Sequence, residues 1–370
     1  MESSHSQLAV DAGQAPLALA GWSLLEQMQR NAVQVVTEDA ETEREYLEGL
    51  RAVARISSLC AQISVEADTD QPRFFDMCSP TRMVGGPNPD GNYYLAMIRG
   101  DRTYRITGSR GTTTYLGFQV LAGTGLTPRR MAAYVSDRDL TLRGGEFTLL
   151  LAADEPSPEM LGDARWVQIP RDASSIVVRE YIADRATEGT SSLRIEALDA
   201  APVAPLTDAE LGEQLTAMAW TLLKLITLHR TIKPEMLTTP NVLLTAEAAD
   251  LGAADTTPDN LYMIGTYRLE PDQALVLEFE PPDTRYWNVT LETIWHEVPE
   301  PGRRHVSVTN RGVAVGDDGL VRIAISARDF GYGHWLDTGG RHRGFVLLRW
   351  LDNPTAPDVR VSVRTEGNLK

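Results

Sequence analysis

The N-terminal part of the chain repeats apolar side chains at steps of three and four residues. One run extends from Leu17 to Val36 and a second from Tyr46 to Ile63, with an acidic break between them. This spacing is that of one face of an α-helix. The sequence therefore predicts an N-terminal helical segment over residues 1–70, with two amphipathic helices that pack together or against a sheet.

After residue 70 the pattern changes to short segments that are rich in aromatic and β-branched residues. Turns that contain glycine separate these segments, of which residues 93–98 and 115–121 are examples. Strands this short, spaced by turns, are typical of antiparallel sandwiches and barrels. We interpret residues 71–205 as a first β-sandwich domain.

A helical pattern then interrupts the β-rich sequence. Thr207 and Glu210 have the spacing of a capping box, in which each side chain accepts a hydrogen bond from the other residue's backbone N–H. Apolar residues follow at helical spacing, so we interpret residues 206–250 as a helical connector.

Residues 251–370 return to the β-rich pattern and are predicted to form a second β-sandwich domain. Within this region the sequence Gly-Asp-Asp-Gly at 316–319 favours a hairpin turn between strands at 312–315 and 320–326.

The two β-rich regions begin in a similar way. Each begins with Pro-Asp followed closely by tyrosine, at Asp90 and Tyr94 in the first region and at Asp259 and Tyr262 in the second. Each also follows a helical segment and runs through two strands to a further tyrosine. The sequence therefore predicts a mostly β fold with helical segments, in which two jelly-roll-like antiparallel β-sandwich domains arose by internal duplication. Asp90 and Asp259 should then lie at the same turn of the two domains.

Four motifs occur in order along the second β-rich region. They are Thr-Pro-Asp-Asn-Leu-Tyr from Thr257, Ala-Leu-Val-Leu-Glu from Ala274, Tyr-Trp-Asn from Tyr286 and Trp-Leu-Asp-Thr-Gly-Gly from Trp335. Together they resemble the bacterial family named domain of unknown function 1214, over residues 255–352. The stretch from Asn88 to Gly123 is similar to a divergent copy of domain of unknown function 1254, which often precedes that family. The resemblance implies two jelly-roll-like domains joined by helices, and it implies no particular activity.

The charge balance excludes two classes of partner. Lys and Arg number 35 against 51 Asp and Glu, which gives a net charge of −16. So acidic a surface repels phosphate backbones and anionic lipids, and we expect neither nucleic acid nor a membrane as partner. The N-terminus has no basic start of a signal peptide, and no apolar run reaches the roughly 20 residues of a spanning helix. We therefore expect a cytoplasmic protein, and leave open whether it forms homo-oligomers.

Several familiar catalytic motifs are absent from the sequence or incomplete. Asp337-Thr-Gly339 occurs once, whereas aspartic-protease chemistry needs two such carboxylates, so a loop aspartate is the preferred interpretation. The histidines near the C-terminus, His296 among them, form no His-x-His pair, so we expect no metal and interpret His296 as a satisfied or surface side chain. A P-loop, a dinucleotide fingerprint and a serine nucleophile elbow are all missing, and no cofactor is expected.

Polar residues at the entrances of the two β-rich regions are the remaining candidates for chemistry. Asp90 and Asp259 are predicted as catalytic carboxylates, with Tyr94 and Tyr262 as ligand-binding phenols nearby. The alternative is that each aspartate only caps its turn. A cation and an aromatic face at Arg285 and Trp287 complete the predicted ligand site, although the same residues suit a sheet edge.

These residues favour a function at the cleft between the two β-domains. We expect a soluble protein that binds a small uncharged or lipophilic molecule there and acts on it as a cofactor-independent hydrolase. The alternative is a non-catalytic protein that uses the same concavity to bind a ligand or to serve as a scaffold.

Overall fold

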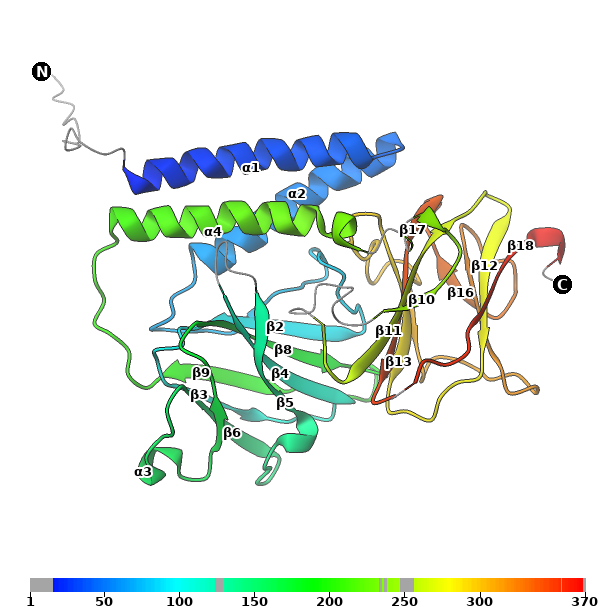
Figure 1. The fold of residues 1–370 in the computed structure, drawn as a ribbon. Helices are drawn as coiled ribbons and strands as arrows, with labels where there is room; N and C mark the ends of the chain where they lie inside the picture. Colours follow the sequence, from blue (N-terminus) through cyan, green and yellow to red (C-terminus); the bar gives the residue numbers. More distant parts are fainter. Residues whose placement is uncertain are drawn as a thin grey trace, which may run out of the picture.

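The computed structural model describes the chain except residues 1–15, 124–128, 233–234, 236–237, 247–255, 354 and 369–370. Three long helices lie on one side of the molecule, with α1 and α4 side by side above the first β-domain (Figure 1). The helices are α1 (Leu17–Asp39), α2 (Glu43–Ser64), α3 (Pro158–Leu161) and α4 (Asp208–Ile226), with short 3-10 turns η1 (Asp137–Asp139), η2 (Leu228–Thr231) and η5 (Glu366–Asn368).

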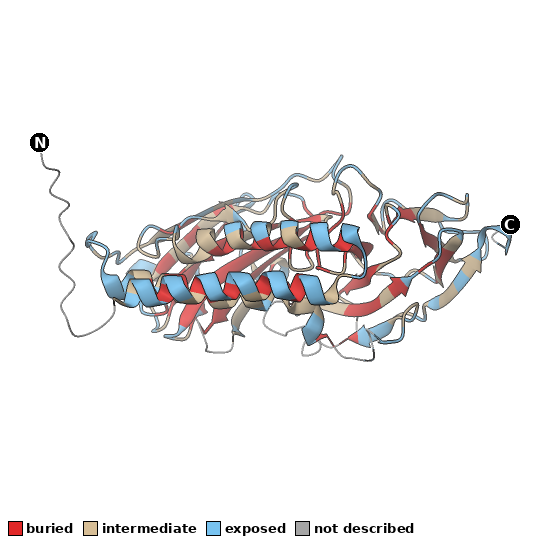
Figure 2. Ribbon diagram, turned by 90° about the horizontal axis from the view of Figure 1, so that it is seen from above, coloured by how far each residue is buried: buried red, intermediate tan, exposed pale blue. Residues whose placement is uncertain are grey.

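Local side-chain chemistry begins α4 at the predicted place. In α4, Thr207 and Glu210 form the predicted capping box. Glycines let α1 and α4 approach closely, because a Cβ at Gly21 would lie 2.7 Å from the carbonyl oxygen of Gly212. Each long helix buries one side and exposes the other, as the apolar spacing predicts. Figure 2 shows buried and exposed residues alternating along the helices that are visible from above. None of the helices in the described ranges is long and apolar enough to cross a membrane.

The first β-domain consists of two packed sheets. A five-stranded sheet has the order β1-β2-β8-β4-β5, and a four-stranded sheet has the order β7-β6-β3-β9. All neighbours pair antiparallel except β6 and β7, which are parallel. The strands are β1 (Phe75–Asp76), β2 (Gly91–Met97), β3 (Tyr104–Ser109), β4 (Tyr115–Ala122), β5 (Arg130–Ser136), β6 (Glu146–Ala152), β7 (Arg165–Gln168), β8 (Ala173–Tyr181) and β9 (Ser192–Ala197).

The second β-domain repeats this topology. Its five-stranded sheet has the order β10-β11-β17-β13-β14, and its four-stranded sheet β16-β15-β12-β18, with β15 and β16 as the parallel pair. The strands are β10 (Leu244–Ala246), β11 (Asn260–Arg268), β12 (Gln273–Phe279), β13 (Trp287–Glu292), β14 (Ser307–Thr309), β15 (Val321–Ser326), β16 (His334–Asp337), β17 (Arg343–Leu351) and β18 (Arg360–Thr365).

The backbone register confirms that the two halves are copies. Gly91 pairs with Tyr181 in the first domain, and Asn260 pairs with Leu351 in the second. The residue after each of these partners donates its N–H to an aspartate carbonyl, that of Asp90 or of Asp259, at 2.8 Å in both cases. Asp90 and Asp259 therefore occupy equivalent turns, as the duplicated Pro-Asp motif predicts.

Two local predictions need correction, and one boundary is left undescribed. The segment 312–315 is not a strand: the 316–319 turn forms, with the N–H of Gly316 bonded to the carbonyl of Leu320 at 2.9 Å, but no strand pairing continues before it. Residues 244–246 of the predicted helical connector form β10, at the edge of the second five-stranded sheet. The predicted boundary between connector and second domain, at residue 250, lies outside the described residues.

Candidate functional site

The two predicted carboxylates each reach from one β-domain to the other. Asp90 accepts hydrogen bonds from the Ser307 hydroxyl at 3.1 Å and the Asn288 amide at 3.3 Å. Asp259 accepts one from the Tyr134 hydroxyl at 2.6 Å. The strand registers make Ser307 and Tyr134 equivalent positions of β14 and β5. The aspartates thus make matching contacts across the domain junction.

Asp90 titrates unusually because it is buried at this junction. Burial raises the pKa of its carboxyl, while the hydrogen bonds from Ser307 and Asn288 oppose the rise. The folded protein therefore holds this proton more tightly than the unfolded chain, in which an aspartate has a pKa of about 3.9. The carboxyl contributes most to stability below that value, and the contribution is lost as the pH rises through the folded pKa.

The variant Asp90→Asn cannot titrate, so its stability relative to wild type should rise between about pH 3.5 and pH 7. Urea denaturation of both proteins at the two pH values measures this difference. Asp101→Asn is the opposite control, because a hydrogen bond from Arg99 lowers the pKa of Asp101. Its stability relative to wild type should not rise over the same range, and a flat difference for Asp90→Asn would refute the burial argument.

The register separates the two predicted tyrosines. The Tyr262 hydroxyl accepts a hydrogen bond from the Thr257 N–H at 3.0 Å. Its counterpart in the first domain is Tyr93, whose hydroxyl accepts from the Asn88 N–H at 2.8 Å. Tyr94 points to the opposite face of β2, since side chains alternate along a strand, and packs against the core of the first domain. Tyr94 therefore does not lie beside Tyr262.

Arg285 and Trp287 also lie apart from one another. Arg285 forms ion pairs with Asp137 at 2.9 Å and Asp352 at 2.7 Å, and so links the two β-domains. Trp287 is buried in the core of the second domain, with its ring 5.3 Å from Phe279. Of the six predicted site residues, the structure places four at the domain junction and two in the cores. The four are Asp90, Asp259, Tyr262 and Arg285.

A buried cluster that the sequence analysis did not recognise as a unit lies on the junction-facing side of β13 and β17. Its histidine, His296, was expected to be a satisfied or surface side chain, but it is buried and its Nε2 atom has no hydrogen-bond partner among the described side chains. The cluster consists of Glu292, His296 and Arg349, all less than 5% exposed. The Nδ1 atom of His296 is 2.7 Å from Glu292 Oε2, and an Arg349 nitrogen is 3.8 Å from Glu292 Oε1. We call these three residues the Glu–His–Arg cluster.

The backbone of the first domain closes over the Glu–His–Arg cluster. Gly86 accepts a hydrogen bond from Arg349 at 2.9 Å and donates its N–H to the carbonyl of His296 at 2.9 Å. A Cβ at Gly86 would lie 3.4 Å from Glu292 Oε1, and its φ of +72° is one that glycine adopts most easily. The cluster is therefore part of the domain junction.

Two polar atoms of the cluster have no hydrogen-bond partner. They are Glu292 Oε1 and His296 Nε2, both buried, among the side chains that the structure describes. Buried polar atoms in native proteins are almost always satisfied, by protein, water or a ligand. With the Glu292 carboxylate ionised, the proton of a neutral His296 ring is on Nδ1, so Nε2 is a hydrogen-bond acceptor. The cluster thus presents two buried acceptors, one of which, Glu292 Oε1, lies 3.8 Å from the Arg349 cation.

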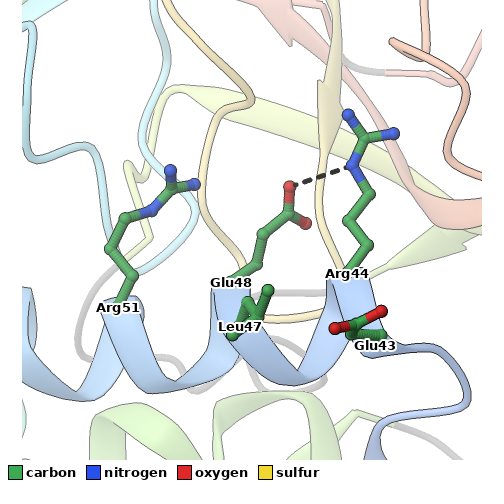
Figure 3. Close-up of a pocket in the computed structure, with 5 residues that line it drawn as sticks. All are labelled: Glu43, Arg44, Leu47, Glu48 and Arg51. Carbon is green, nitrogen blue, oxygen red and sulfur yellow. Dashed lines mark ion pairs between the residues drawn. The ribbon is translucent and has the colours of Figure 1, made fainter.

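A surface pocket and the grouping of possible metal ligands give weaker evidence of a functional site among the described residues. A pocket of about 580 Å³ on α2 is lined by charged side chains and one leucine, and Figure 3 shows Arg44 and Glu48 turned toward each other as an ion pair. Because the charges of its lining residues compensate, this pocket gives no reason to expect a specific ligand. Within the described ranges, no three His, Cys, Asp or Glu side chains are grouped as metal ligands.

Comparison with known proteins extends the sequence resemblance. Residues 254–355 match the family described as a protein of unknown function (DUF1214). This confirms the resemblance of the C-terminal half, and the resemblance of the N-terminal half to domain of unknown function 1254 stays a prediction. No curated protein matches the chain.

Solved structures share the fold over nearly the whole chain. An uncharacterized protein from Burkholderia cenocepacia is 26% identical, with a TM-score of 0.89, and the alignment covers 96% of this chain and all of that one. The VPA0106 protein from Vibrio parahaemolyticus is 11% identical, with a TM-score of 0.50, over 92% of this chain and all of that one. The second likeness concerns the fold alone, and neither name carries a function.

Proposed function

We propose that this protein binds a small uncharged molecule at the junction of its two β-domains, through the Glu–His–Arg cluster. The observation that supports the proposal is the pair of buried acceptors without a partner, Glu292 Oε1 and His296 Nε2, among the described side chains. An unsatisfied buried polar group costs about 1–3 kcal/mol, and a ligand that fills these acceptors, directly or through a water bound with it, would remove that cost.

The charges of the cluster favour a ligand without net charge. Glu292 and Arg349 are both buried and carry opposite charges. A charged ligand would leave one charge of this low-dielectric site uncompensated, which is strongly unfavourable. An apolar ring also lies next to the cluster, since Phe345 stacks on His296 with ring centroids 4.2 Å apart. Hydroxyl or amide groups next to a lipophilic part would suit these neighbours.

The alternative, a non-catalytic scaffold, has a separate observation in its favour. Asp90, Asp259 and Arg285 each make polar contacts between the domains. Such contacts orient the two domains relative to each other, so the role of these residues is to hold the domains in place. The binding proposal accommodates these contacts as well. The carboxylates that the sequence predicts as catalytic then stabilise the junction, and the Glu–His–Arg cluster contacts the ligand.

A thermal-shift screen of small uncharged alcohols, amides and esters tests the binding proposal. Compounds that bind should raise the Tm of wild type, since a ligand at about 100 times its Kd adds about 2.7 kcal/mol of stability. The same compounds should not shift His296→Asn, because Asn tolerates the φ of +54° at this position but lacks the imidazole.

The matched control for this screen is His334→Asn. His334 lies on β16, and its Nε2 accepts from the Ala314 N–H at 2.7 Å, outside the cluster. This variant should respond to the compounds as wild type does. A screen without any stabilising compound, or one in which His296→Asn responds as wild type does, would contradict the proposal.

A further inference from the structure

The ring of His296 is fixed in direction by its surroundings. It lies in a tight turn after β13, in which the Thr293 hydroxyl accepts from the N–H of Trp295 at 3.2 Å and of Glu297 at 3.3 Å. Glu292 bonds Nδ1, and Phe345 stacks on the ring face. A backbone in the left-handed region is costly for a residue other than glycine, and such strain is concentrated at functional sites. These contacts aim Nε2 in one direction.

The fold itself does not require an acid at position 292. The strand registers make Leu121 of β4 the equivalent of Glu292 in the first β-domain. There Leu121 packs with Leu95 and Val177. The same face also carries Arg179, the equivalent of Arg349, which is buried and bonds the side chain of Gln119. The first domain forms the same strand order with a leucine at this position. The presence of a buried carboxylate at Glu292 is therefore not explained by the stability of the fold. Burying an ion pair is often no more stabilising than apolar packing.

Arg349 is positioned to stabilise negative charge next to His296. Its Nη2 donates to the Gly86 carbonyl and its Nη1 to the Thr290 hydroxyl at 3.3 Å, which fix the guanidinium plane. The cation lies 3.8 Å from Glu292 Oε1, the acceptor without a partner. A preorganised cation in a buried site stabilises a developing oxyanion more strongly than water does.

We infer that His296, oriented by Glu292, is a general base that activates water to hydrolyse a small neutral carboxylic ester bound beside Arg349. This inference rests on the proposed binding function. Nε2 accepts a proton from water as the water oxygen bonds to the ester carbonyl carbon. The carbonyl oxygen becomes an oxyanion that Arg349 stabilises. The bond from carbon to the alcohol oxygen then breaks, and His296 returns its proton to the leaving alkoxide. One ester and one water give one carboxylic acid and one alcohol.

The test uses 4-nitrophenyl acetate as a neutral ester and the full-length protein. Wild type should release 4-nitrophenol faster than buffer, with saturation. 4-Nitrophenyl acetate has no donor that could bond Glu292 Oε1 directly. Glu292→Gln keeps the shape of the side chain but removes its charge, so kcat should fall by about 100-fold with little change in KM. His296→Asn should be no faster than buffer.

The matched control is Glu278→Gln on β12. Glu278 bonds the side chains of Arg364 and Tyr332 on the other sheet of the second domain, outside the Glu–His–Arg cluster. It should keep the wild-type rate. A wild-type rate no higher than that of His296→Asn, or an unchanged kcat in Glu292→Gln, would overturn the inference.

The amide analogue 4-nitroacetanilide separates this inference from the binding proposal. If the amide raises the Tm of wild type and the ester is not hydrolysed, the hydrolytic role of His296 is wrong and the binding site remains. If the amide does not raise the Tm and the ester is not hydrolysed, both proposals are wrong. A Tm shift together with turnover that depends on Glu292 supports both.

Discussion

Replacing Arg349 by methionine is expected to lower the free energy of unfolding by about 3–5 kcal/mol. The change keeps the apolar stem of the side chain but leaves the Glu292 carboxylate buried without its cation. It also removes the hydrogen bond to the Gly86 carbonyl across the junction. Urea denaturation of the variant and of wild type at neutral pH measures the loss.

Two further variants make this prediction specific. The double variant Arg349→Met with Glu292→Gln should recover a large part of the loss, because no buried charge then lacks a partner. Arg322→Met removes a cation from an ion pair with Asp318 that is more accessible to water, and should cost at most about 1 kcal/mol. Equal losses for Arg349→Met and the double variant would show that charge compensation is not what Arg349 provides.

Replacing Trp287 by alanine is expected to cost about 3–5 kcal/mol of stability. The indole is 1% exposed and packs with Phe279 and Trp350 at the centre of the second domain, so its loss leaves a cavity. The Tm shifts caused by small uncharged compounds should persist in the folded variant, because Trp287 lies on the core side of β13.

Trp22→Ala is the matched control for this core substitution. Trp22 lies on α1 and is 53% exposed, so its replacement should change stability by no more than about 0.5 kcal/mol. If Trp287→Ala were as stable as wild type and failed to respond to the compounds, Trp287 would be a ligand contact, as its position beside Arg285 in the sequence suggests.

The elements and the duplication could be predicted because their signals are local. Alternation and turn residues indicate the strands, and the Pro-Asp motifs place Asp90 and Asp259 at equivalent turns. The same offset from each aspartate leads to Tyr93 and Tyr262, so the choice of Tyr94 could have been avoided. Which face of a strand points to the junction, however, depends on the neighbouring sheets, and a single strand does not encode it.

The Glu–His–Arg cluster was missed because its parts are distant in sequence. Glu292 and His296 look like polar residues at the end of a strand, and the turn from Thr293 that brings them together resembles a continuation of that strand. Arg349 belongs to β17, and Gly86 to the loop between β1 and β2. These groups are buried because the two domains pack together. The local pattern of apolar residues does not predict contacts between domains.

The matching contacts of Asp90 with Ser307 and of Asp259 with Tyr134 have the geometry of a symmetric dimer of one β-domain. In such a dimer every substitution would occur twice, on both sides of the axis. Joining the copies in one chain frees each from that constraint, so one sheet carries Glu292 where the other carries Leu121. The covalent link also keeps the two halves close together, so each is present at a high effective concentration near the other. The junction therefore stays formed at any dilution of the protein.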